Sequence, residues 1–267
     1  MYIVISSHIP RINIKLMKRI INFSGGKSSA LMTILEYNPE TDYVVFCDTG
    51  REHKKTYKFI MDFEANENIP VIKIGYNKKG YEIVTDLGSK DYFREYLSHR
   101  SGKELPNMEK RSCTIEMKIK TTRRWARKNI GMAYVNMIGL RSEETSRVLK
   151  NKKRWKQVKQ KFPLVERELN KEMVNQFWLT KLYKLEIPSI LGNCTLCFMK
   201  GKDNIINILR HDPSLAQVWI DDENKTGRTY LTGISIEKCL KISQIPDLFS
   251  SVNLEDLSPA FNCGCNS

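Results

Sequence analysis

Long apolar stretches are missing from this chain of 267 residues: no run approaches the roughly 18 apolar residues that a membrane-spanning helix needs. The charged start, apolar core and small-residue cleavage site of a secretory signal are also missing. Histidine is scarce, and its 4 copies are scattered without a metal-ligand spacing. No internal repeat or low-complexity tract occurs. We therefore expect a cytoplasmic protein without a membrane partner.

Acidic residues are in deficit, because 44 Lys and Arg face 30 Asp and Glu, which gives a formal net charge of +14. A surplus of this sign attracts anions, from nucleic acids to phosphorylated nucleotides. Much of it lies in a lysine-rich run at 150–161, which is either a solvated face or a track for RNA or DNA. Charge alone therefore leaves the anionic partner open.

Strand-like and helix-like segments alternate over the first half of the chain. Strands are expected at 19–23, 43–47, 71–74 and 134–138, and helices at about 28–37, 53–67, 117–130 and 171–184. This alternation predicts an α/β fold with a doubly wound parallel sheet, whose ligand site lies at the carboxyl ends of the strands. We expect an N-terminal extension at 1–17, a nucleotide-binding domain at 18–150 and a smaller, mainly helical, cysteine-bearing lobe at 151–267.

The strongest local motif is the turn between the first strand and the following helix, Ser24-Gly25-Gly26-Lys27-Ser28-Ser29. Adjacent glycines let an anion approach the backbone, and the helix N-terminus favours negative charge. The spacing excludes a Walker loop. Asp48-Thr49 and Gly139-Leu140-Arg141 follow two other strands, and Asp48 is a candidate acceptor for a nucleoside. Arg141 and Arg147 can present planar forks to phosphate or sulfate oxygens.

Seven cysteines in a chain without an export signal predict metal or thiol chemistry rather than a disulfide framework. Cys194 and Cys197 form a Cys-x-x-Cys pair in what is expected to be a polar turn. Together with Cys113 and a tail cysteine, Cys263 or Cys265, they supply enough thiolates for zinc or for iron and sulfide. Cys47 and Cys239 are expected in the core, as are the aromatics Trp155, Phe177, Trp178 and Trp219.

These segments, in this order, resemble the phosphoadenylyl sulfate (PAPS) reductase-like family of the adenine nucleotide α-hydrolase, or PP-loop, superfamily, including its phage-type branch. The resemblance rests on the Ser24–Ser29 loop, Asp48-Thr49-Gly50, Gly139-Leu140-Arg141 with Arg147, and the segment from Gly192 to Phe198. It implies a Rossmann-like fold and an adenine nucleotide ligand, PAPS, its desphospho relative APS, or ATP, with Mg as a further candidate.

The resemblance also implies roles for individual residues. The loop residues Ser24, Gly25, Gly26, Lys27, Ser28 and Ser29, with Asp48, Thr49, Gly139, Arg141 and Arg147, would bind the nucleotide. A [4Fe–4S] cluster, or zinc as the alternative, would be held by Cys113, Cys194, Cys197 and Cys265. Lys27 and the tail cysteines Cys263 and Cys265 would be catalytic.

Three functions are compatible with this reading. The first is thiol-dependent reduction of a sulfonucleotide, with an external dithiol donor such as thioredoxin. The second is an ATP-dependent, iron–sulfur sulfurtransferase that modifies tRNA or DNA; Ser28, where ATP-cleaving members commonly have an acid, counts against it. The third is a non-catalytic nucleotide-binding or host-interaction protein, because a fold does not determine a function.

Overall fold

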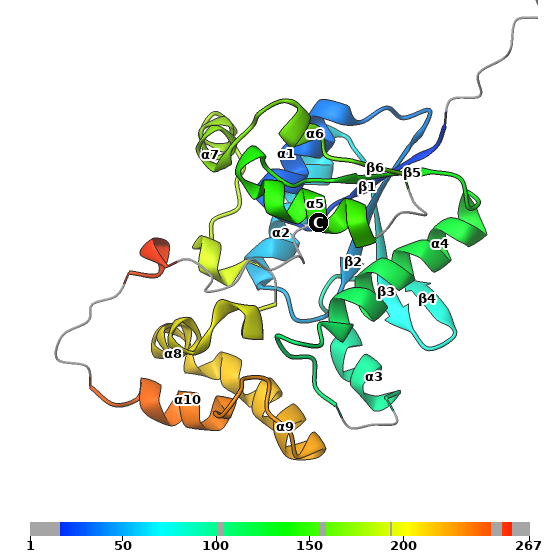
Figure 1. Ribbon diagram of the computed structural model, residues 1–267. Helices are drawn as coiled ribbons and strands as arrows, with labels where there is room; N and C mark the ends of the chain where they lie inside the picture. Colours follow the sequence, from blue (N-terminus) through cyan, green and yellow to red (C-terminus); the bar gives the residue numbers. More distant parts are fainter. Residues whose placement is uncertain (1–16, 101–103, 155–158, 193, 247–252, 258–267) are drawn as a thin grey trace, which may run out of the picture.

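A computed structural model describes residues 17–100, 104–154, 159–192, 194–246 and 253–257 (Figure 1). Within these residues, six strands form one sheet in the order β4-β3-β2-β1-β5-β6. The strands are β1 (Arg19–Asn22), β2 (Asp42–Asp48), β3 (Val71–Asn77), β4 (Gly80–Ile83), β5 (Val135–Ile138) and β6 (Lys159–Lys161). All neighbours are parallel except the β3–β4 pair, so the expected α/β doubly wound sheet is confirmed.

Helices cover both faces of the sheet. The α-helices are α1 (Lys27–Glu36), α2 (Lys54–Glu67), α3 (Tyr92–Ser98), α4 (Thr121–Asn129), α5 (Thr145–Arg154), α6 (Pro163–Glu166), α7 (Lys171–Leu179), α8 (Lys202–His211), α9 (Gln217–Thr226) and α10 (Ile236–Ser243). A π-helix, η1, spans Thr114–Lys120, and the 3-10 helices are η2 (Ser142–Glu144), η3 (Ser189–Leu191), η4 (Phe198–Lys200), η5 (Pro213–Ala216) and η6 (Leu254–Asp256). Within the described ranges, no helix is long and apolar enough to cross a membrane.

The central strand β1 shows how the two faces are divided. Ile20 and Ile21 are both fully buried, but they point to opposite faces because side chains alternate along a strand. Ile21 belongs to the cluster formed with α1, α2 and α7, whereas Ile20 belongs to a cluster around Trp125 of α4. The apolar run of β1 therefore reflects burial on both sides, as parallel sheets require.

A further apolar cluster joins α8, α9 and α10 to α3 and to the segment around Cys197. Figure 1 shows these three C-terminal helices as one group below the sheet. The expected boundary near residue 150 lies within α5, and the segments that follow return to the sheet: β6 pairs with β5, and α6 and α7 pack on α1.

The expected strands and helices are present with small differences in their ends, except in two places. The helix expected at 117–130 begins earlier, as a π-helical segment at Thr114–Lys120, and becomes α-helical from Thr121. The helix expected at 171–184 ends at Leu179, where Thr180 is the C-cap and its N–H donates to the Phe177 carbonyl. Asn170 is its N-cap, as expected, and accepts a hydrogen bond from the Met173 N–H at 2.9 Å.

Candidate functional site

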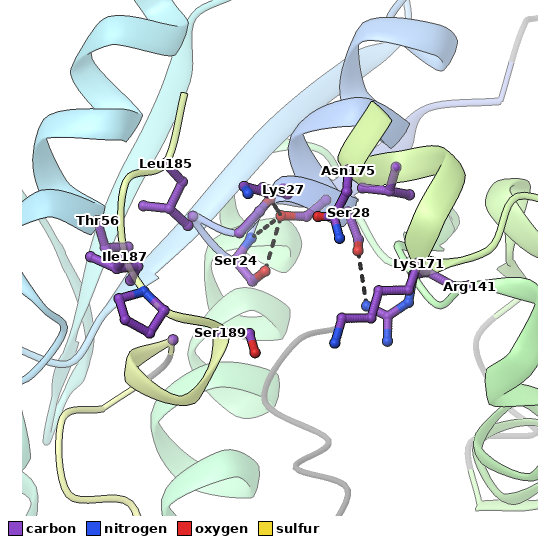
Figure 2. Close-up of a pocket in the computed structure, with 16 residues that line it drawn as sticks. Ser24, Lys27, Ser28, Thr56, Arg141, Lys171, Asn175, Leu185, Ile187 and Ser189 are labelled. Atoms are coloured by element: carbon purple, nitrogen blue, oxygen red, sulfur yellow. Dashed lines mark hydrogen bonds between the residues drawn. The ribbon is translucent and has the colours of Figure 1, made fainter. Parts of the chain in front are cut away.

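The loop between β1 and α1 is held in one curve by its own serines. Ser29 Oγ accepts the Ser24 N–H at 3.0 Å, lies 2.9 Å from Ser24 Oγ, and donates to the Gly26 carbonyl at 3.0 Å (Figure 2). Gly25 has a φ of +74°, and a Cβ there would lie 2.8 Å from Thr56 Cγ2. Only glycine fits that position without strain.

This loop delivers the chain to the N-terminus of α1. Gly26 is the N-cap and offers no side-chain oxygen to the first N–H groups of the helix. Unsatisfied N–H groups and the positive end of the helix dipole together favour an anion at such a position. The backbone of this turn thus has donors and a dipole that favour an anion, independently of any cationic side chain.

A cavity of about 290 Å³ opens in front of this loop. Its basic side chains are Lys27, Arg141 and Lys171, which come from α1, the end of β5 and α7, and none of the described residues that line it is acidic (Figure 2). The opposite wall is largely apolar and contains Leu185, Ile187 and Pro188. The cavity therefore pairs a cationic side with an apolar side.

Arg141 is aimed at the loop by acidic neighbours. Its Nη1 donates to Ser28 Oγ at 3.1 Å and its Nε donates to Glu143 Oε1 at 2.6 Å, while its backbone N–H donates to Glu144 Oε2 at 3.0 Å. Burial opposes ionisation of Glu143, but the hydrogen bond and charge of Arg141, together with backbone hydrogen bonds, outweigh it and lower the pKa of that carboxyl. Glu143 thus stays ionised and orients the guanidinium.

Gly139 and Arg147 support this arrangement from behind. A Cβ on Gly139 would lie 3.0 Å from Ser29 Cα, so the end of β5 approaches the start of α1 as closely as the backbone allows. Arg147 is buried, pairs with Glu144 and does not line the cavity. Its position is that of a residue that fixes Glu144 and, through it, Arg141.

Asp48 and Thr49 follow β2, as expected, but they lie outside the described lining of the cavity. The Asp48 carboxylate is fully buried and accepts from the Gly50 N–H at 2.8 Å, the Tyr57 hydroxyl at 2.8 Å and the Gly88 N–H at 3.0 Å. Both carboxylate oxygens of Asp48 therefore accept hydrogen bonds from within the protein rather than facing a nucleoside. These bonds stabilise the loop after β2.

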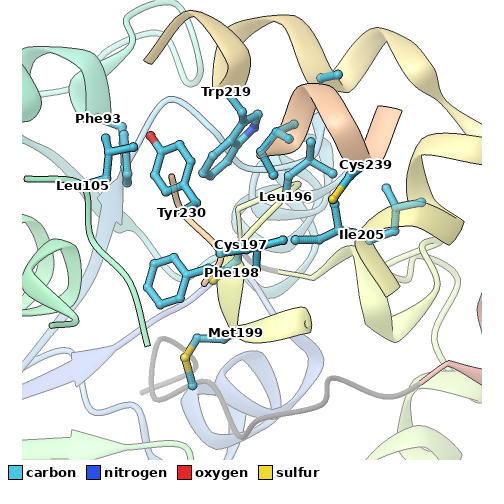
Figure 3. Close-up of a cluster of buried hydrophobic side chains, with 14 of the residues drawn as sticks. Phe93, Leu105, Leu196, Cys197, Phe198, Met199, Ile205, Trp219, Tyr230 and Cys239 are labelled. Carbon is cyan, nitrogen blue, oxygen red and sulfur yellow. The ribbon is translucent and has the colours of Figure 1, made fainter. Parts of the chain in front are cut away.

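The Cys-x-x-Cys segment forms a turn, as expected, but the turn is largely buried: Thr195, Leu196 and Cys197 are buried and Cys194 is partly buried. Cys197 is 6% exposed and packs with Leu196, Phe198 and Cys239 in an apolar cluster (Figure 3). Cys194 Sγ lies 3.5 Å from Thr49 Oγ1 and 4.0 Å from Glu52 Oε1. An isolated bridge between Cys194 and Glu52 ties this segment to the loop after β2.

Across the residues that the structure describes, no three His, Cys, Asp or Glu side chains form a group that could hold a metal ion. Cys113, Cys194 and Cys197 alone therefore do not supply a cluster site, and Cys263 and Cys265 lie outside the described residues. Cys239 is fully buried and Cys47 is partly buried against the Trp125 cluster, as expected for core residues. Trp178 and Trp219 are also core residues, whereas Trp155 lies outside the described part.

The sequence reading missed the contribution of α7 and of the chain that follows it. Lys171 and Asn175 line the cavity, and Trp178 Nε1 donates to the Lys27 carbonyl at 2.9 Å. The available signal was the capped, amphipathic start of α7, which identified a helix but not its neighbour. Its position against α1 is a tertiary contact about 150 residues away in sequence.

Comparisons with known proteins agree with this geometry. The model of the phosphoadenosine phosphosulfate reductase domain matches residues 18–186, which run from β1 to the apolar wall of the cavity. The chain is also 25% identical over 218 residues to the "Uncharacterized nin region protein ORF290" of Escherichia phage lambda, covering 76% of this chain and 73% of that protein. The chain thus belongs to the phosphoadenosine phosphosulfate reductase domain family.

Proposed function

We propose that the cavity binds an adenine sulfonucleotide and that the chain reduces it in a thiol-dependent reaction. The observation that carries this proposal is the convergence of Lys27, Arg141 and Lys171 on one cavity without an acidic lining residue. Three cations and the N-terminus of α1 match the phosphate and sulfate charges of such a ligand.

The two walls of the cavity suggest how the nucleotide lies. Phosphate and sulfate oxygens would take hydrogen bonds from Lys27, Arg141 and the loop N–H groups. The adenine would pack on Leu185, Ile187 and Pro188, which offer an apolar surface of the kind a base face covers. Asn175 supplies a polar side chain between the two walls.

The reaction requires a thiolate that attacks the sulfate sulfur. A new S–S bond forms as the bond between that sulfur and the bridging phosphate oxygen breaks, which leaves a cysteine S-sulfonate and releases the nucleotide phosphate. An external dithiol then attacks the cysteine sulfur, becomes a disulfide and releases sulfite. Cys263 and Cys265 are the candidate nucleophiles, while Lys27 and Arg141 would neutralise the phosphate that leaves.

An iron–sulfur cluster or a structural zinc does not fit the described residues, since they hold no metal-ligand group of three and since Cys197 packs among apolar side chains. The two other readings, a nucleic-acid sulfurtransferase and a non-catalytic nucleotide-binding protein, predict different results in the assay below.

The test is titration of the full chain with PAPS, APS, ATP and adenosine 3′,5′-bisphosphate, followed by a sulfite assay with reduced thioredoxin. Lys27→Ala removes one charge-assisted contact and should weaken sulfonucleotide binding about 10- to 100-fold. Lys225→Ala, which removes an exposed charge on α9, should leave the affinity unchanged.

Cys263→Ser and Cys265→Ser then identify the nucleophile. One of them should retain nucleotide affinity and lose sulfite release. Binding without turnover in the unaltered chain would overturn the reductase and favour a binding protein, and turnover of ATP alone would favour the sulfurtransferase. Lys27→Ala binding as tightly as the unaltered chain would overturn the cavity assignment itself.

A further inference from the structure

A second basic region lies on the opposite face of the sheet from α1, along α4. Lys120, Arg123, Arg124 and Arg127 line a surface hollow of about 530 Å³, whose lining is completed by Gly131, Met132 and Tyr134. No described residue that lines this hollow is acidic. It shares no lining residue with the cavity in front of the β1–α1 loop.

The cations face outward because the other side of α4 is anchored. Trp125 and Ala126 are buried against the sheet, and Trp125 meets the Tyr43 ring edge-on at 5.6 Å between centroids. Arg124 and Arg127 are three residues apart and therefore lie on the same side of the helix. The packing of Trp125 thus holds the basic residues of α4 on its outer side. We call Lys120, Arg123, Arg124 and Arg127 the stripe.

The two exposed arginines differ from most other arginines in their charge balance. Within the described residues, no carboxylate lies within ion-pair distance of Arg124 or Arg127, whereas Arg19, Arg94 and Arg167 each contact at least one. Lys120 pairs with Glu116 at 2.7 Å, and Arg123 hydrogen-bonds Tyr134. Among the described residues, the positive charge that no carboxylate neutralises is therefore that of Arg124 and Arg127.

The stripe starts beside the carboxyl ends of β1 and β2. In the segment just before α4, the Lys118 carbonyl accepts from Cys47 Sγ of β2, and Lys118 lines a small cavity that Ser24 also lines. From there, Lys120 to Arg127 are seven residues apart, or about 10 Å of helix at 1.5 Å per residue. Aligned with a duplex axis, that length covers about three base-pair steps at about 3.4 Å each.

We propose that this stripe binds the phosphodiester backbone of a nucleic acid. Guanidinium forks bind phosphate oxygens in two-point contacts, and an open hollow admits a chain that continues beyond it on both sides. The proposal goes beyond the reduction of a sulfonucleotide, which needs no polymer. It also moves the expected nucleic-acid track from the run at 150–161 to α4.

The test measures binding of fluorescein-labelled 20-nucleotide single-stranded DNA, RNA of the same sequence and the DNA duplex, from 50 to 200 mM NaCl. Arg124→Gln with Arg127→Gln should weaken binding at least about 10-fold and reduce the slope of log affinity against log salt by about 2. The control, Lys225→Gln with Lys238→Gln, removes two exposed lysines from α9 and α10 and should change the slope far less.

Further measurements decide between the outcomes. Arg124→Lys with Arg127→Lys keeps both charges and should restore most of the affinity, which excludes a folding defect, as does unchanged sulfonucleotide affinity in the glutamine variant. Preference among the three probes identifies the kind of nucleic acid. The proposal is overturned by equal losses in the α4 and control variants, by salt-independent binding, or by no binding to any probe at 50 mM NaCl.

Discussion

Arg141 and Arg51 both follow a strand of the same sheet, yet the fold treats their charges in opposite ways. Arg51 is 4% exposed, with Nη2 2.8 Å from Asp91 Oδ2 and Nη1 2.7 Å from Asp222 Oδ2. Its guanidinium also lies over the rings of Phe93 and Trp219, at 4.9 and 5.0 Å from their centroids. Arg141 instead lines an open cavity and contacts the serine of a loop.

The surroundings of the two guanidinium groups distinguish a cation that stabilises the fold from a cation that faces a cavity. Burial disfavours the charged form of Arg51, but the carboxylates of Asp91 and Asp222 outweigh it and raise its pKa, so the charge is kept and compensated inside the protein. These contacts join the loop after β2 to α3 and α9. Arg141 also pairs with Glu143 and Glu144, but its side chain lines a cavity, where the proposed ligand would be a further partner.

Removing Arg51 is expected to have the largest effect. Arg51→Ala removes the closest cation from the buried carboxylate of Asp222, which keeps only the Tyr230 hydroxyl at 3.0 Å and the partly exposed Arg94 Nε at 3.5 Å, and should lower the free energy of unfolding by about 3–5 kcal/mol. Urea unfolding measures this, with Arg167→Ala as the control because its ion pair with Glu36 is partly exposed and should matter by no more than about 1 kcal/mol. A loss below about 1 kcal/mol for Arg51→Ala would show that Arg51 stabilises the fold no more than Arg141 does.

Removing Arg141 should give the reverse pattern. Arg141→Ala is expected to weaken sulfonucleotide binding about 10- to 100-fold, because a charge-assisted contact is lost. Its effect on the free energy of unfolding should stay within about 1 kcal/mol, since the side chain is 22% exposed. Titration calorimetry and urea unfolding of the same preparation check both numbers. A large stability loss with unchanged affinity would place Arg141 in the same class as Arg51.

Alkaline pH should lower the stability of the protein through a buried thiol near Arg51, in the cluster that contains Trp219. Burial raises the pKa of the Cys239 thiol, in the same cluster as Trp219, to about 11. The stability that this neutral thiol contributes is complete below the unfolded pKa of about 8.5 and is lost as the pH rises toward 11, by up to about 1.4 kcal/mol per pH unit.

Unfolding measured between pH 8 and 11 should therefore give a shallower decline in Cys239→Ala than in the unaltered chain. Cys47, whose pKa burial also raises to about 11, remains in both proteins and cancels in the difference. Identical slopes for the two proteins would show that this thiol is accessible to solvent.

The smallest effect on affinity is expected from the contact between α7 and the binding loop. Trp178→Phe removes the hydrogen bond to the Lys27 carbonyl and also one ring of a fully buried side chain, which leaves a small gap in the core. We expect a loss of about 1–2 kcal/mol in stability and a several-fold weaker sulfonucleotide affinity, measured by the same two methods. Unchanged affinity would show that Lys27 needs no support from α7.

Much of the sheet and the β1–α1 loop could be predicted from sequence because both are local patterns. Apolar runs identified β1, β2, β3 and β5, and the glycine pair after β1 identified the turn that opens onto the cavity. β4 and β6 escaped because β4 is only partly buried and β6 is the polar run Lys159–Lys161. Lys171 and Asp48 show the limit: the first gains its place only when α7 packs on α1, and the second loses its oxygens to Tyr57 and Gly88.

The distance along the chain between the two walls of the cavity has a consequence for synthesis. The loop at Ser24–Ser29 leaves the ribosome early, but the apolar wall at Leu185–Gly192 follows about 160 residues later. A nascent chain therefore carries an incomplete site for most of its translation, and nucleotide can stabilise only chains that have passed this point. A bound nucleotide would then stabilise chains that contain both walls over chains that end before Leu185.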